Sequence, residues 1–114
     1  MTSGMRTVVY PVTDLAAATA LYATLLGVAP HTETPYYVGF SAGGQEVGLD
    51  PNGHGSGMTG PVGYWHVDDL AGTVRRLLDA GAATVQEPRD VGGGKLIATV
   101  KDADGNVIGL VQEP

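Results

Sequence analysis

The sequence predicts an α+β fold made of two similar modules in tandem. One phrase occurs twice: residues 5–27 read MRTVVYPVTDLAAATALYATLLG, and residues 61–81 read PVGYWHVDDLAGTVRRLLDAG. In both copies a run rich in Val and Tyr, typical of a half-buried strand, precedes an Asp-Leu-Ala step and a helical pattern that ends in Gly. Because each unit is too short to bury its own apolar face, the repeat indicates two modules that share one core.

Each predicted helix begins after an aspartate and ends at a glycine. Asp14 and Asp69 stand at the N-cap position, where a carboxylate accepts hydrogen bonds from free backbone N–H groups and complements the helix dipole. Gly27 and Gly81 can adopt the left-handed conformation that follows a helix. Helical spacing in the first copy predicts a stripe facing the core: Leu15, Ala18, Leu21, Tyr22, Leu25 and Leu26.

Three further strands are predicted after each helix, so that each module reads strand, helix, strand, strand, strand. After the first strand of each module, the expected strands are residues 28–32, 36–41 and 45–50, and then 83–87, 95–100 and 106–112. Gly43-Gly44 and Asp104-Gly105 are turn signals between the last two strands of each module. We expect a single domain over residues 1–114, with module one at about 5–50, a glycine-rich linker at 51–60 and module two at about 61–114.

Composition limits the partners that the chain can have. The 114 residues carry a formal net charge of −6, which counts against nucleic acid and anionic membranes, because both require a basic surface. The absence of cysteine excludes disulfides, a thiol nucleophile and a Cys-based metal site. The first residues lack the apolar core of a secretory signal, so we expect a cytoplasmic protein.

A set of short motifs, in this order, resembles the vicinal oxygen chelate superfamily of glyoxalases, bleomycin resistance proteins and dioxygenases. The motifs are Val12-x-Asp14-Leu15, Tyr22, Leu26-Gly27, Val67-x-Asp69, Ala80-Gly81 and Asp102-x-Asp104-Gly105-Asn106. The resemblance implies paired βαβββ modules that form a curled mixed sheet around a cavity, with the helices on the outer face. It also implies a homodimer, since many relatives are dimeric.

The positions that the resemblance assigns to metal ligands carry no normal donor. They correspond to Thr7 and Gly48 in module one and to Val62 and Gly109 in module two. Zinc, iron and similar metals need several imidazole, carboxylate or thiolate donors that converge on one point. We therefore expect no metal and no cofactor. The alternative is a divalent metal at a displaced site made of Glu46, Asp50 and His66.

Alternation along the strands predicts which residues line the cavity. The expected lining is Thr7, Val9, Tyr37, Glu46, Gly48, Asp50, Val62, Tyr64, His66 and Gly109. We expect Gly48 and Gly109 to leave free volume, Trp65 to lie in the core against the helices, and His31 to be solvated near a strand end.

The resemblance and the expected cavity lining together predict two classes of function. The first is a metal-free small-molecule-binding protein of the bleomycin resistance type, which binds or sequesters an organic ligand or antibiotic. Glu46 and Asp50 would favour a cationic ligand. The second is an enzyme of the lyase, isomerase or dioxygenase class, with either the displaced metal or a metal-free acid–base pair of His66 and Glu46.

Overall fold

The computed structural model describes residues 2–114, and only Met1, at the start of the predicted domain, lies outside this range. The chain divides into two compact units. The first unit is Arg6–Val62, and the second unit is residues 2–5 together with Gly63–Pro114. The elements run β1 (Thr2–Pro11), α1 (Leu15–Leu26), β2 (Thr32–Glu33), β3 (Val38–Ala42), β4 (Gln45–Asp50), the short helix η1 (His54–Ser56), β5 (Val62–Val67), α2 (Leu70–Asp79), β6 (Ala83–Asp90), β7 (Leu96–Lys101) and β8 (Val107–Gln112).

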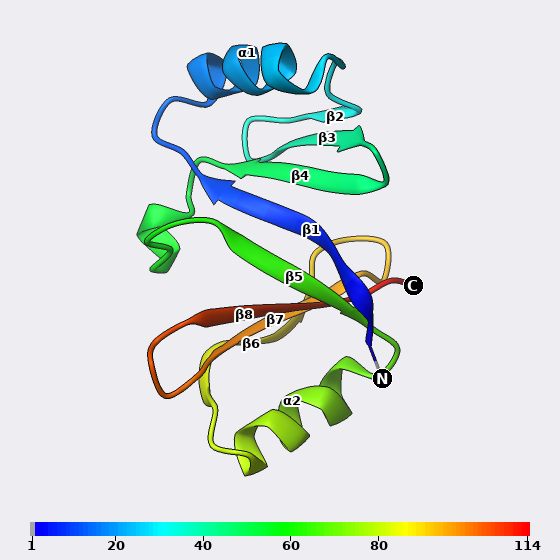
Figure 1. Cartoon of the computed structure of the whole chain (residues 1–114), viewed down its shortest axis with the longest axis vertical. Helices are drawn as coiled ribbons and strands as arrows, with labels where there is room; N and C mark the ends of the chain where they lie inside the picture. The colour runs from blue at the N-terminus through cyan, green and yellow to red at the C-terminus, as the bar shows by residue number, and fades with distance from the viewer. Residues whose placement is uncertain (1) are drawn as a thin grey trace. The chain divides into compact units, whose positions relative to one another are not determined.

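In the first unit, one helix covers one face of a mixed sheet (Figure 1). The strand order is β2-β3-β4-β1; β1 runs parallel to β4, and β3 runs antiparallel to both β2 and β4. Alternate residues of β3 and β4 form the buried core under α1: Val38, Phe40, Val47 and Leu49. Tyr22 of α1 packs on this cluster with its ring 5.0 Å from that of Tyr10, and burial raises the pKa of the Tyr22 hydroxyl.

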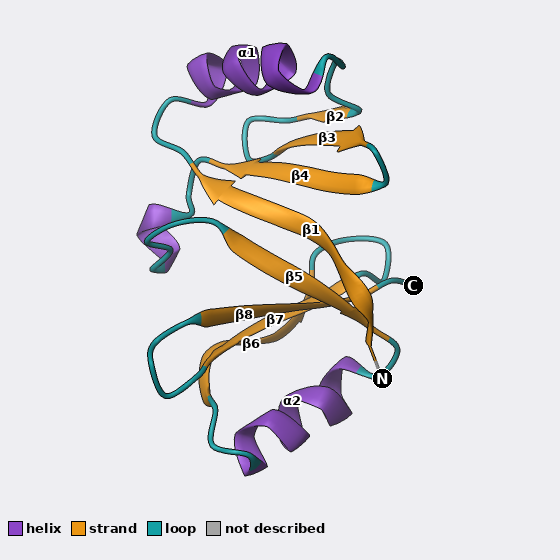
Figure 2. Cartoon of the chain, viewed as in Figure 1, coloured by secondary structure: helices purple, strands orange, loops and turns teal. Residues whose placement is uncertain are grey.

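The second unit repeats this arrangement, with α2 beside strands β5-β8-β7-β6 (Figure 2). β5 runs parallel to β8, and β7 is antiparallel to both β6 and β8. The buried core consists of Val67, Leu70, Val74, Ala98, Val100 and Leu110. Each unit is thus a βαβββ module with a mixed sheet, which confirms the predicted α+β class.

The predicted helix caps are present in both modules. Asp14 Oδ1 accepts a hydrogen bond from the Ala17 N–H at 3.0 Å, and Asp69 Oδ1 accepts one from the Gly72 N–H at 3.1 Å.

Gly43-Gly44 forms the tight turn between β3 and β4, with φ of 58° and 79°, values that suit glycine. The final hairpin turn is also as predicted. There the Asn106 side-chain amide donates to Asp102 Oδ2 at 2.9 Å, which lowers the pKa of that carboxyl.

Three apolar side chains expected in the core are exposed instead. Leu21 and Leu25 are 66% and 73% exposed, while Leu15, Ala18, Tyr22 and Leu26 pack on the core as predicted. Helix α1 carries no charged residue, so spacing alone could not show where its apolar stripe ends. Trp65 of β5 is 40% exposed, because α2 packs mainly on β6, β7 and β8.

Strand boundaries differ most from the prediction around the first hairpin. The strand expected at residues 28–32 is β2, Thr32–Glu33, and the strand expected at 36–41 begins later, at Val38. The reason is a turn built by Thr34, which the prediction did not include. Within residues 2–114, no helix is long and apolar enough to cross a membrane.

Candidate functional site

The face of the first unit opposite the α1 core carries two glycines side by side. Strand alternation places Val38, Phe40, Val47 and Leu49 in the core, so Gly39 and Gly48 lie on the other face. The two are register partners in the antiparallel pair β3–β4. Without side chains at these positions, the sheet presents bare backbone here, and we call Gly39 and Gly48 the glycine floor.

The ring of Tyr37 lies across the glycine floor. A Cβ atom added at Gly48 would come 2.5 Å from the Tyr37 hydroxyl oxygen and 2.6 Å from its Cε1. A Cβ added at Gly39 would come 2.9 Å from Tyr37 Cε2 and 2.7 Å from Glu46 Oε2. The two edges of the ring therefore rest over the two glycines, and any larger residue would occupy the space that the ring fills.

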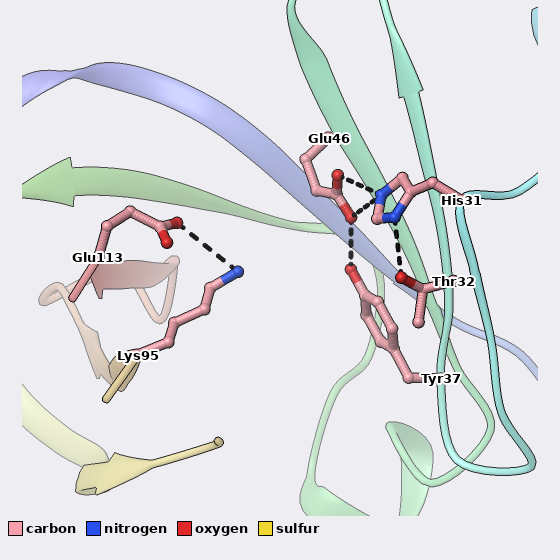
Figure 3. Close-up of polar contacts among 6 residues, drawn as sticks. All are labelled: His31, Thr32, Tyr37, Glu46, Lys95 and Glu113. Atoms are coloured by element: carbon pink, nitrogen blue, oxygen red, sulfur yellow. Dashed lines mark hydrogen bonds and ion pairs between the residues drawn. The ribbon is translucent and has the colours of Figure 1, made fainter. Parts of the chain in front are cut away.

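Four polar side chains meet at the edge of this floor and form what we call the Glu46 cluster: His31, Thr32, Tyr37 and Glu46 (Figure 3). The Tyr37 hydroxyl donates to Glu46 Oε2 at 3.1 Å. His31 Nε2 lies 2.8 Å from Glu46 Oε1 and 3.1 Å from Oε2. Because the carboxylate only accepts, Nε2 carries the proton in this contact. On the other side of the ring, Nδ1 is 2.8 Å from Thr32 Oγ1.

The backbone holds these side chains in place. The Thr34 hydroxyl oxygen accepts from the Tyr37 N–H at 3.0 Å, and the Thr34 N–H donates to the Tyr37 carbonyl at 2.9 Å. The His31 N–H donates to the Gly39 carbonyl at 2.9 Å, which fixes the imidazole beside the floor. The side chains of Glu46 and His31 remain 25% and 45% exposed. A solute can therefore reach both.

The other predicted lining residues of the first unit lie on β1, at the end of β4 and at the start of β5. Thr7 and Val9 of β1 are register partners of Glu46 and Gly48. Asp50 ends β4, and its Oδ1 accepts from the Asn52 N–H at 2.8 Å. Val62 is buried, as is Thr7.

The second unit contains the remaining predicted residues: Tyr64, His66 and Gly109. Tyr64 of β5 is the register partner of Gly109 of β8. A Cβ at Gly109 would come 2.7 Å from both Cγ and Cδ2 of the Tyr64 ring. His66 is half-buried, and its carbonyl accepts from the Thr2 hydroxyl at 2.9 Å.

The expectation of free volume at Gly48 and Gly109 is wrong. In both units a tyrosine ring fills the space beside the glycine, Tyr37 over Gly48 and Tyr64 over Gly109. The physical reason is that a bare backbone lets an aromatic face approach within van der Waals distance, and this contact is favourable.

His31 is the site residue that the sequence interpretation missed, because it was expected to be solvated. It is the hydrogen-bonded imidazole partner of Glu46. The turn from Thr34 to Tyr37 could have revealed it, since an antiparallel return of β3 along β2 pairs Thr32 with Gly39 and so brings His31 to the same place. The role of His66 beside Glu46 stays a prediction.

Comparison with known proteins places this architecture in a family. The family model of the Glyoxalase/Bleomycin resistance protein/Dioxygenase superfamily matches residues 4–110. The chain belongs to this superfamily. No curated protein matches the sequence.

Solved structures share the superfamily fold at low sequence identity. Methylmalonyl-CoA epimerase from Mycobacterium tuberculosis is 22% identical with a TM-score of 0.75, over 99% of this chain and 89% of that one. A superfamily member from Vibrio splendidus 12B01 is 16% identical with a TM-score of 0.71, over 99% and 100% of the two chains. The Mn(II)-bound glyoxalase from Novosphingobium aromaticivorans is 22% identical with a TM-score of 0.70, over 97% of this chain and 39% of that one.

The donor set of this chain does not fit a divalent metal at the positions that the superfamily resemblance assigns to ligands. Gly48 and Gly109 have no side chain, Val62 has no donor atom, and rings of Tyr37 and Tyr64 cover the glycines. Across residues 2–114, no three His, Asp or Glu side chains are grouped so that they could hold a metal ion.

The glycine floor yields a direct test by substitution. We expect Gly48→Ala to lower the free energy of unfolding by about 1–3 kcal/mol, because the new Cβ overlaps the Tyr37 ring and forces it from Glu46. Denaturant unfolding measures this change. Gly55→Ala is the matched control, since a Cβ there meets nothing within 4 Å. Equal stability of the two variants would contradict the packing described here.

Proposed function

We propose that this protein binds a small organic molecule on the face of the first unit that carries the Glu46 cluster. The observation that supports this is a carboxylate held by two neighbours yet 25% exposed, beside an imidazole that is 45% exposed. A surface with a few fixed polar groups beside aromatic area is the usual form of a small-molecule site. Family membership agrees, since a methylmalonyl-CoA epimerase from Streptomyces coelicolor has been solved in complex with 2-nitronate-propionyl-CoA.

The chemistry of the cluster selects the kind of ligand. Glu46 offers acceptor oxygens, and the chain carries a net charge of −6, so a cation or a strong hydrogen-bond donor is favoured over an anion. Sequestration of such a compound in the cytoplasm, by a homodimer of the bleomycin resistance type, is the form of this function that we propose.

Binding should depend on the charge of Glu46. In a panel of cationic antibiotics and aromatic amines, we expect at least one compound to bind, and Glu46→Gln to weaken it by about tenfold or more, because a hydrogen bond to a charged group is lost. Isothermal titration calorimetry measures both affinities. Glu113→Gln removes the carboxylate that pairs with Lys95 at 3.7 Å, and it should change nothing. A panel without binders, or equal affinity in Glu46→Gln, would refute the proposal.

The second candidate is a metal-free enzyme that moves a proton, and the orientation of His31 favours it. The imidazole is held from both sides, by Glu46 at Nε2 and by Thr32 at Nδ1, each at 2.8 Å. A base oriented by a neighbouring group is a common acid–base arrangement. Structural relatives that are named as epimerase and glyoxalase support this candidate.

Exchange of an acidic proton tests this candidate without knowledge of the natural substrate. With thioesters and α-ketoaldehydes in D2O and chelator, we expect exchange at the carbon next to the carbonyl, slowed about 100-fold or more in His31→Gln. Proton NMR follows the exchange. His54→Gln, in the exposed η1 loop, should retain the rate, and His66→Ala tests the assignment made from the sequence. Unchanged exchange in His31→Gln would reject a role for this imidazole.

A further inference from the structure

The Tyr37 ring lies on the glycine floor of the first unit as a bound planar ligand would. Its ring is not part of the core, because the core cluster lies on the opposite face of β3 and β4. It comes from the turn before β3, and both edges of the ring lie close to backbone that lacks side chains. Its neighbour Tyr36, in the same turn, is 72% exposed.

The two glycines under this ring weaken the strands that carry them. Glycine inside a strand weakens it and commonly marks a place where a ligand or another group approaches the backbone closely. Here two such glycines are register partners on neighbouring strands. The described residues of the second unit contain no such pair, since Gly109 pairs with Thr99 on β7 and a tyrosine ring covers Gly109 alone. The paired floor of the first unit therefore fits a ring-sized planar group.

The hydroxyl of Tyr37 adds a specific polar contact. It donates to Glu46 Oε2 at 3.1 Å, the oxygen that also lies 3.1 Å from His31 Nε2. The other carboxylate oxygen, Oε1, keeps its contact with His31 at 2.8 Å. Glu46 therefore stays oriented by His31 when the tyrosine leaves, and Oε2 can accept from a different donor.

The attachment of Tyr37 allows its ring to leave while the strand stays in place. The backbone is held by Thr34, which accepts from the Tyr37 N–H at 3.0 Å and donates from its hydroxyl to the Tyr37 carbonyl at 3.1 Å. The ring joins this anchored backbone through the Cα–Cβ bond. Rotation about that bond moves the ring off the floor without breaking a strand hydrogen bond.

We propose that the glycine floor and Glu46 form a recognition site for a planar aromatic ligand with a hydrogen-bond donor on the ring, such as a phenol, and that Tyr37 occupies this site until the ligand displaces it. This inference rests on the proposed function, small-molecule binding at this face, and names its ligand class. Because Tyr37 competes from within the chain, its removal should tighten binding.

Removal of the tyrosine provides the test, with p-cresol as the free equivalent of its side chain. We expect Tyr37→Gly to bind p-cresol saturably, with NMR shifts at the amides of Gly39 and Gly48. Toluene, which lacks the hydroxyl, should bind about tenfold to 100-fold more weakly. Tyr36→Gly is the matched control and should bind p-cresol only as weakly as the wild type, because the exposed Tyr36 ring is removed while Tyr37 stays on the floor. Equal binding of p-cresol and toluene, or no shift at the two glycines, would overturn the assignment.

A second arm uses the intact chain and does not depend on how the variant folds. When wild-type protein with ¹³C-labelled tyrosine is titrated with p-cresol, the Tyr37 ring signals should move to those of an exposed tyrosine, with lower affinity than in Tyr37→Gly. Unchanged Tyr37 signals up to the solubility limit of p-cresol would overturn the displacement. If a compound binds the wild type in a Glu46-dependent way while Tyr37 stays in place, this inference fails and the proposed function stands.

Discussion

The contact on which the site depends is the close approach of the Tyr37 ring to the paired glycines of β3 and β4. Hard-sphere overlap decides it: a single Cβ at either position would come within 2.9 Å of the ring. The ring in turn sets the position of its hydroxyl, and the hydroxyl helps to orient Glu46. Tyr37 and His31 thus orient the Glu46 carboxylate from two sides.

The same strands supply the site and the core. Successive residues alternate faces, so Val38 and Phe40 anchor β3 under α1 while Gly39 is presented to the other side. A buried, rigid strand holds a functional side chain more accurately than a loop does. Glu46 lies on strand β4. Tyr37 comes from a turn and His31 directly precedes β2, and backbone hydrogen bonds hold both residues in place.

Local features of the fold could be predicted from the sequence, and contacts between distant residues could not. Asp14 and Asp69 cap the helices because a cap is satisfied within three residues of the chain. The pairing of His31 with Glu46 joins positions 15 residues apart and depends on the register of β2, β3 and β4. The exposure of Trp65 likewise depends on which strands α2 covers. The sequence predicts free space at a strand glycine, but the residue on the adjacent strand and the nearby ring decide what fills that space.

The most direct test of the contact between the Tyr37 ring and the glycine floor is the proton NMR shift of the glycine α-protons in the wild-type protein. Protons that lie under the face of an aromatic ring move upfield, so the α-protons of Gly39 and Gly48 should be shifted upfield and should return toward ordinary values in Tyr37→Leu. Ordinary shifts at both glycines in the wild type would show that the ring does not rest on them, and the site described here would lose its basis.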